Sequence, residues 1–188
     1  MCIRDRVVTF LGKAKYLKEV IEVNKLTDVF VDNSYIEGEL YYAPSGVQYH
    51  FLNTGVKYDP PNEMCNRRIR IATMIREIVK TIDDNIIFVD SDVLAKDVRK
   101  LDGLDRPAVF PIPAKAKPFD YIIVFDRSTN FYLPRSYREV LKGALDEYLQ
   151  NNLYIFEPVD LYIHRKIGSV TFWLPGVCHY IDDKKYCI

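Results

Sequence analysis

The feature that most constrains the fold is a short apolar run in the middle of the chain. Residues 85–89 read Asn-Ile-Ile-Phe-Val and are followed at once by Asp90-Ser91-Asp92. An apolar run without alternation is typical of a parallel strand that is covered on both faces. In open α/β sheets, ligands bind at the carboxyl ends of the strands. The segment therefore predicts an α/β sheet with a polar site at Asp90 and Asp92.

The rest of the chain alternates strand and helix patterns around this segment. Apolar runs bounded by turn residues predict strands at residues 7–10, 28–32, 40–42, 47–51, 108–113, 121–125, 153–156 and 169–174. Helical spacing predicts helices at residues 13–26, 59–82, 136–149 and 159–167. The second helix has an apolar face from Met64 to Ile82, and Ser136 and Glu139 form a capping box that opens the third. This order predicts one sheet, parallel in its first half.

Composition narrows the class of protein. The chain has 188 residues and is 48% apolar, which is enough for one domain with a sizeable core. Its 26 Lys and Arg residues balance 26 Asp and Glu residues, so no nucleic-acid partner is predicted. The longest apolar runs span about five residues, whereas a membrane span needs about 20, so no transmembrane segment is predicted.

The first six residues bear on where the domain begins, and the cysteines bear on the cellular compartment. Residues 1–6 have no apolar period and resemble the translation of a sequencing adapter, so we exclude them and assign one domain to residues 7–188. The other cysteines, Cys65, Cys178 and Cys187, have no Cys-x-x-Cys spacing. This argues against both structural zinc and a disulfide framework and predicts a reducing, cytoplasmic compartment.

Two carboxylates one residue apart at a strand end suit a divalent cation. Asp90 and Asp92 can converge on one hard ion, and Mg²⁺ and Mn²⁺ prefer oxygen ligands. The alternative is a strand-end turn with solvated carboxylates. His179, near the C-terminus, is a candidate third ligand or else a structural histidine.

Two further groups are candidates, each with a structural alternative. Asp32 and Asn33 end an earlier strand, where the carboxylate is suited to accept a hydrogen bond from a nucleotide base or to close an Asx turn. Arg67 and Arg68, with Arg70 nearby, suit a diphosphate or form a solvated basic face.

A late acidic segment completes the set. Glu157 and Asp160 flank the start of the last predicted helix. A carboxylate at this place is suited to deprotonate an attacking hydroxyl. The alternative is capping of the helix N-terminus by acidic residues.

The order of these groups resembles that of the inverting GT-A glycosyltransferases of the family-2 type. Residues 28–34 look like their "DDxS" strand end, and residues 67–92 look like their Arg-bearing helix followed by "hhhhDxD". Residues 157–168 (EPVDLYIHRKIG) look like their "EDxDLxxRxxxxG" element, and residues 169–179 resemble the strand and His that follow it. The resemblance implies a single-domain GT-A fold, Rossmann-like, with a mixed, mostly parallel central sheet flanked by helices.

The resemblance also implies a reaction and roles for residues. A UDP- or GDP-linked sugar would bind with its base near Asp32 and Asn33, and with Thr9 among the donor contacts. Arg67 and Arg68 would hold the diphosphate. Mn²⁺ or Mg²⁺ would be bound by Asp90, Asp92 and His179, with Asp90 also close to the ribose.

The same resemblance predicts inversion at the sugar and names candidates for the base. Pro158 stands where the family has its catalytic Asp, which leaves Glu157 and Asp160 as candidate bases. The acceptor is not indicated and is a carbohydrate, a lipid-linked molecule or a protein.

Four other readings remain, one of which is a generic α/β domain without such a site. A catalytically degenerate nucleotide-sugar-binding protein would explain Pro158. A sugar nucleotidyltransferase of related fold needs a Gly-rich loop after the first strand, and residues 10–14 hold one glycine. A haloacid-dehalogenase-like phosphatase shares the Asp-x-Asp strand end, but residues 93–95 are out of register with its motif.

Overall fold

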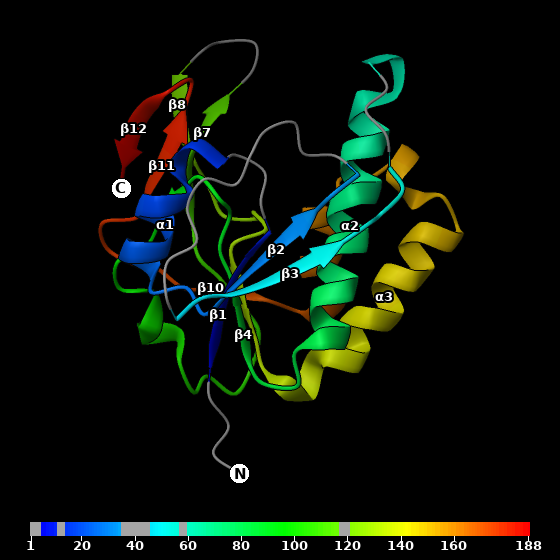
Figure 1. The fold of residues 1–188 in the computed structure, drawn as a ribbon, viewed down its shortest axis with the longest axis horizontal. Coiled ribbons are helices and arrows are strands. Elements are labelled where there is room, and N and C mark those ends of the chain that lie inside the picture. Colours follow the sequence, from blue (N-terminus) through cyan, green and yellow to red (C-terminus); the bar gives the residue numbers. More distant parts are fainter. Residues whose placement is uncertain (1–4, 11–13, 35–45, 57–59, 117–120) are drawn as a thin grey trace.

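The computed structural model describes residues 5–10, 14–34, 46–56, 60–116 and 121–188, and its centre is a seven-stranded sheet (Figure 1). The strands run in the order β10-β6-β9-β4-β1-β2-β3. β9 is antiparallel to both of its neighbours, and every other pair is parallel. The strands are β1 (Arg6–Phe10), β2 (Asp28–Asp32), β3 (Gln48–Leu52), β4 (Ile86–Phe88), β6 (Ala108–Val109), β9 (Phe131–Leu133) and β10 (Val170–Thr171). The predicted mixed, mostly parallel α/β sheet is confirmed.

Helices cover both faces of this sheet. They are α1 (Leu17–Asn24), α2 (Glu63–Thr81), α3 (Arg138–Gln150) and α4 (Val159–Ile167), with 3₁₀ turns η1 (Ala14–Tyr16), η2 (Pro60–Asn62), η3 (Val98–Leu101), η4 (Arg135–Tyr137) and η5 (Leu153–Ile155). Because side chains alternate along a strand, Val8 packs with α2, α3 and α4, whereas Val7 packs with α1. Figure 1 shows α2 and α3 side by side on one face. No helix in the described ranges has the length and apolar character that a bilayer span requires.

Two small sheets lie beside the main one. β5 (Val93–Leu94), β11 (Cys178–Ile181) and β12 (Lys184–Cys187) form an antiparallel sheet, and β7 (Ile112–Ala116) pairs with β8 (Tyr121–Phe125). Figure 1 shows both at the same end of the molecule, beside α1. The β5–β11 pairing matters for function, because it places His179 opposite Val93, next to Asp92.

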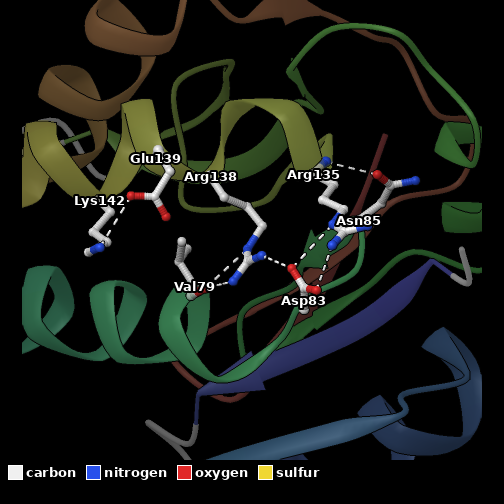
Figure 2. A network of polar contacts seen from close by, with 7 residues as sticks. All are labelled: Val79, Asp83, Asn85, Arg135, Arg138, Glu139 and Lys142. Carbon is white, nitrogen blue, oxygen red and sulfur yellow. Dashed lines mark hydrogen bonds and ion pairs between the residues drawn. The ribbon is translucent and has the colours of Figure 1, made fainter.

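A polar network ties the end of α2 to the start of α3, as Figure 2 shows. Arg138 donates to the Val79 carbonyl at 2.6 Å and also pairs with Asp83. Arg135 forms a second ion pair with Asp83 at 2.6 Å, and its backbone N–H donates to the Asn85 side chain. These contacts fix the two helices relative to each other and to β4, and so hold α2 in place.

Several predicted elements differ from the structure. The predicted strand at residues 153–156 is instead the 3₁₀ turn η5 followed by Phe156, and the predicted strand at 108–113 is divided between β6 and β7. The Ser136 capping box is wrong, because α3 begins after Tyr137 and its start has no side-chain cap. The strand predicted at residues 40–42 and the helix start at Asp59 lie outside the described residues.

The exclusion of the first six residues from the fold is wrong for Arg6. This residue begins β1 and pairs in register with Ile86 of β4. Its guanidinium donates to both carboxylate oxygens of Asp28, at 2.7 and 2.8 Å, and the Asp28 side chain is fully buried. A buried carboxylate needs such a partner, so Arg6 contributes to the fold of this chain. The adapter origin of residues 1–6 stays a prediction.

The expectation of no disulfide is also wrong. Cys178 and Cys187 are bonded and lie directly opposite each other on β11 and β12. The hairpin between them turns at Asp182 and Asp183, both of which have positive φ. Two adjacent residues of this kind are typical of the turn that matches the twist of a hairpin. The spacing therefore follows from strand pairing, which a search for Cys-x-x-Cys motifs does not detect.

Candidate functional site

A cavity of about 620 Å³ lies at the carboxyl ends of β1 and β4. Phe10 ends β1 on one side of it, and Asp90, Ser91 and Asp92 follow β4 on the other. Six of the predicted site residues line this cavity: Arg67, Arg68, Asp90, Asp92, Asp160 and His179. Segments distant in the sequence therefore meet at the sheet edge where α/β proteins bind ligands.

Asp90 is held by the residues that precede β9. The Thr129 hydroxyl donates to one carboxylate oxygen at 2.6 Å, and the Asn130 amide donates to the other at 2.7 Å. The Asn130 side-chain oxygen in turn accepts from the Asp90 backbone N–H at 2.7 Å. Burial and the nearby Asp92 charge raise the pKa of Asp90 above its usual range. The carboxylate is thus fixed in position but is costly to ionise.

Sequence analysis missed Thr129 and Asn130. They act through the antiparallel pairing of β9 with β4, in which Phe131 lies opposite Phe88. This register brings the residues before β9 next to those after β4. The only local signal was a run of small polar residues, 128–130, in front of an apolar strand.

His179 and Asp92 form the second polar pair of the cavity. The Nδ1 atom of His179 lies 2.6 Å from the Pro113 carbonyl, so Nδ1 donates and Nε2 faces Asp92 at 3.4 Å. Burial opposes the imidazolium charge, but the contacts with Asp92 and Pro113 outweigh it and raise the pKa of His179. A carbonyl that orients the second ring nitrogen is also the arrangement found around metal-binding histidines.

The donor set fits a divalent cation only in part. Across the described ranges, no three or more His, Cys, Asp and Glu side chains are grouped as a metal site. Asp92 and His179, 3.4 Å apart, offer one oxygen and one nitrogen ligand. Mg²⁺ commonly takes one or two protein carboxylates and completes its shell with water and phosphate oxygens. An ion at this place would therefore depend on the bound nucleotide.

Three arginines of α2 line one wall of the cavity, and each has a different environment. Arg67 is exposed. Arg68 donates to the Tyr154 carbonyl at 2.8 Å, which ties α2 to η5. Arg70 is buried and pairs with Asp32 at 3.2 Å. Of these three arginines, Arg67 and Arg68 are thus the two that can reach an anionic ligand.

The structure separates the two candidate bases. Asp160 lies in the first turn of α4 and lines the cavity. Burial raises the pKa of Asp160, while backbone N–H groups at the helix start and the charges of Arg68 and Arg67 oppose the shift. Glu157 instead pairs with Arg165 at 2.7 Å and is absent from the cavity wall among the described residues.

The residues predicted to hold the base lie outside the cavity lining. The Asp32 carboxylate, fully buried, accepts five hydrogen bonds, two each from Ser34 and Thr54 and one from Arg70. Asn33 is exposed. Thr9 is buried, and its hydroxyl has no hydrogen-bond partner within the described part of the chain. Contacts of Asp32, Asn33 and Thr9 with a nucleotide stay predictions.

Relatives by sequence are viral proteins. No family model matches the chain. The uncharacterized protein ORF238 of Acidianus filamentous virus 2 (isolate Italy/Pozzuoli) is 34% identical, with 97% of this chain and 99% of that protein covered. The uncharacterized protein 209 of Sulfolobus islandicus rod-shaped virus 1 is 26% identical over 94% of this chain and 81% of that one.

Solved structures identify the fold. The CTP:phosphocholine cytidylyltransferase of Streptococcus pneumoniae superposes with a TM-score of 0.54 at 14% identity, covering 97% of this chain and 95% of that one. The 2-C-methyl-D-erythritol 4-phosphate cytidylyltransferase of Thermus thermophilus gives 0.51 at 11% identity, covering 88% and 87%. A glycosyltransferase involved in glycosylation of the major capsid of PBCV-1 gives 0.47 at 11% identity, covering 90% and 80%. The fold is the Rossmann-like one of the two cytidylyltransferases.

Proposed function

This chain belongs to the family of the uncharacterized protein ORF238 of Acidianus filamentous virus 2, and we propose that it is a metal-dependent glycosyltransferase. It moves a sugar from a nucleotide diphosphate-sugar to an acceptor hydroxyl, with inversion at the sugar. One observation carries the proposal: a single cavity unites a cationic wall, a carboxylate–imidazole pair and a separate carboxylate, Asp160.

The cationic wall suits the diphosphate of the donor. Arg67 and Arg68 are successive residues of α2 on the cavity wall. Guanidinium groups bind phosphate oxygens through paired N–H donors, and the planar fork fixes the orientation of the ligand. The tie between Arg68 and the Tyr154 carbonyl holds its guanidinium in place before the ligand arrives. Binding energy at this wall positions the sugar above the sheet edge.

The carboxylate–imidazole pair suits the metal. Asp92 and His179 would hold the Mn²⁺ or Mg²⁺ ion, with Asp90 behind them, fixed by Thr129 and Asn130. Such an ion offsets the negative charge that builds on the leaving diphosphate. The positive charge that faces the diphosphate would therefore be shared between the ion and the arginines.

Asp160 is the candidate base. In a single displacement, the acceptor oxygen forms a bond to the anomeric carbon as the bond from that carbon to the diphosphate oxygen breaks. The electron pair leaves with the nucleotide diphosphate, and the acceptor proton passes to the Asp160 carboxylate. A carboxylate whose pKa is raised by burial is a better base for this step than a solvated one. Glu157, paired with Arg165, is left as the helix-flanking residue.

A thermal-shift panel tests the proposal. UDP, GDP and CTP are each added with Mn²⁺, with Mg²⁺ and with EDTA. A nucleotide at about 100 times its Kd raises the Tm by about 5–10 °C. We expect this rise for UDP or GDP and only with a divalent ion. If neither diphosphate shifts the Tm with either ion, the proposal is wrong.

The same panel separates the alternatives. CTP is the matched comparison because the fold is shared with two cytidylyltransferases. A shift with CTP and none with UDP or GDP would favour nucleotidyl transfer. A shift with UDP or GDP, but no release of nucleotide diphosphate from UDP- or GDP-sugars in the presence of acceptors, would favour a binding protein without turnover.

A further inference from the structure

His164 is a buried histidine of α4 that is absent from the cavity wall among the described residues. Its Nε2 atom lies 2.6 Å from the Ser128 carbonyl oxygen, which can only accept, so Nε2 donates. Burial lowers the pKa of His164 to about 4, so the ring is neutral at pH 7. Nδ1 of the neutral ring therefore accepts from the Ser169 hydroxyl, 2.9 Å away. The Nε2 bond ties α4 to the residues that precede β9.

Ser128 lies between His164 and Asn130 and is bonded to both. Its hydroxyl oxygen accepts from the Asn130 backbone N–H and from the Asn130 side-chain amide, both at 3.2 Å. The same amide nitrogen donates to the Asp90 carboxylate at 2.7 Å, and an amide nitrogen has two N–H groups for these two bonds. The amide oxygen accepts from the Asp90 backbone N–H. The Asn130 amide is therefore held in one orientation, with Ser128 on one side and Asp90 on the other.

Aromatic packing holds the His164 ring in place. The ring lies edge-on to Phe131, with the two ring centroids 5.4 Å apart and the planes at 89°. Phe131 in turn stacks on Phe88 at 4.6 Å. Edge-to-face and stacked pairs are the favoured geometries of aromatic side chains. The ring that donates to Ser128 is thus fixed against strands β4 and β9.

Resting on the proposed function, we infer that His164 is a positioning residue for the metal site. Its bond to Ser128 fixes the amide of Asn130, and that amide fixes the Asp90 carboxylate beside Asp92. A site whose carboxylates are fixed in advance loses less conformational freedom when the ion and the nucleotide bind. A histidine that served packing alone would change the free energy of unfolding, but not the Mn²⁺ concentration that nucleotide binding requires.

A pair of amide variants tests the Nε2 bond. In His164→Gln the side-chain amide can reach the position of Nε2, whereas the shorter amide of His164→Asn reaches only the position of Nδ1. The measured quantity is the Mn²⁺ concentration that gives half-maximal binding of UDP or GDP. This concentration should rise at least about fivefold in His164→Asn and stay within about twofold of the wild type in His164→Gln. An unchanged value in His164→Asn would overturn the inference.

Arg138→Met is the matched control for stability. Arg138 also donates to a backbone carbonyl, that of Val79, but it lies at the start of α3 and is absent from the cavity wall in the described ranges. This variant should lower the urea midpoint of unfolding and leave the Mn²⁺ requirement unchanged. If Arg138→Met raises the requirement as much as His164→Asn does, the requirement follows stability and the inference fails.

A double-mutant cycle tests whether His164 acts through Asn130. With Asn130→Ala already present, His164→Asn should raise the Mn²⁺ requirement by less than about twofold. A full fivefold rise in that background would contradict the proposed order of contacts. Should His164→Asn not fold, Ser128→Ala takes its place, because it removes only the oxygen that holds Asn130. An unchanged Mn²⁺ requirement in Ser128→Ala would equally overturn the inference.

A measurement on the protein without ligand separates this inference from the proposed function. The side-chain amide ¹H–¹⁵N signals of Asn130, identified by their loss in Asn130→Ala, should move in His164→Asn and keep their positions in Arg138→Met. If they move but the wild type binds neither UDP nor GDP with Mn²⁺, only the proposed function is contradicted. If the wild type binds the nucleotide, while His164→Asn keeps both the Asn130 signals and the Mn²⁺ requirement, only the inference is contradicted.

Discussion

Asp32 and Asp90 follow two strands of the same sheet, and the chain surrounds their carboxylates in opposite ways. Asp32 ends β2 and accepts five hydrogen bonds. Burial alone would raise the pKa of Asp32, but the bonds from Ser34 and Thr54 outweigh it and lower the pKa. Asp90 follows β4, and burial together with the neighbouring Asp92 raises its pKa.

This difference matches the roles that we propose, a structural carboxylate at Asp32 and a metal-site carboxylate at Asp90. Asp32 has its charge stabilised by its own chain, so the ionised form favours the fold. Asp90 and Asp92 are two like charges at a cavity, and the imidazole of His179 lies 3.4 Å from Asp92. A divalent ion bound beside them would favour their ionised forms further. The same sequence pattern, an apolar strand followed by an acid, therefore has two meanings, and the donors around the carboxylate decide between them.

The largest predicted effect is a loss of activity when Asp160, the candidate base in the cavity, is replaced. Asp160→Asn should reduce the release of nucleotide diphosphate by about 10²–10⁴-fold while leaving nucleotide affinity nearly unchanged, because it removes a general base and no donor contact. Glu157→Gln is the matched control and should keep most of the activity, since Glu157 pairs with Arg165. If Glu157→Gln loses activity and Asp160→Asn stays active, Glu157 is the base and Asp160 is not.

The second prediction concerns the structural carboxylate. Asp32→Ala should lower the free energy of unfolding by about 3–5 kcal/mol, because it removes the ion-pair partner of the buried Arg70 and the carboxylate that accepts from Ser34 and Thr54. Urea unfolding followed by circular dichroism measures this. Asp92→Ala in the same assay should cost far less, because it also removes a charge that repels Asp90. If Asp92→Ala is destabilised more than Asp32→Ala, the assignment of Asp32 as the structural carboxylate is contradicted.

A smaller loss of stability is expected when the hydrogen bonds that Asn130 makes with Asp90 are removed. Asn130→Ala should cost about 1–3 kcal/mol of stability, since the Asp90 backbone N–H and one carboxylate oxygen lose their partner. Nucleotide affinity in the presence of Mn²⁺ should fall as well, because Asp90 is no longer fixed. If Asn130→Ala binds the nucleotide with wild-type affinity, the hydrogen bonds between Asn130 and Asp90 contribute to stability alone.

The smallest effect is the pH dependence of stability. The pKa of Asp32 is lower in the folded state than in the unfolded state, where it is about 3.9. The contribution of Asp32 to the free energy of unfolding is therefore fully present above the unfolded-state pKa and is lost as the pH falls through the folded-state pKa. Asp32→Asn should therefore flatten the loss of stability on acidification below about pH 4 relative to the wild type. Unfolding midpoints measured from pH 7 downward check this, and an unchanged slope would contradict it.

Local patterns predicted six of the seven strands of the sheet, all but β9, and most of the charged residues that line the cavity. The reason is visible in particular residues. The apolar strand before Asp90 and the helix that carries Arg67 and Arg68 are local patterns, and the rule that ligands bind at strand ends supplied their common location. Asp160 and Glu157 looked equivalent in the sequence. Only the start of α4 and the Arg165 ion pair distinguish them.

The rest depends on contacts between distant segments. Asn130 reaches Asp90 through the register of β9 with β4, and the Cys178–Cys187 disulfide follows from a hairpin that no spacing motif describes. Arg6 was excluded with the adapter-like residues 1–6, and its contact with Asp28, 22 residues away, is visible only in the folded chain. Phe156 was assigned to a strand, whereas the bonds of Tyr148 and Arg68 hold that segment as a turn.

The central claim is that the cavity at the end of β4 binds a nucleotide diphosphate together with a divalent ion. Calorimetric titration of UDP and GDP in Mn²⁺ tests it on the wild type, on Asp92→Asn and on Asp97→Asn, a control acid that pairs with Lys100 away from the cavity lining. We predict that Asp92→Asn weakens the Kd at least about tenfold and removes its dependence on Mn²⁺, while Asp97→Asn changes neither. Equal affinities in all three proteins, with or without Mn²⁺, would contradict the account.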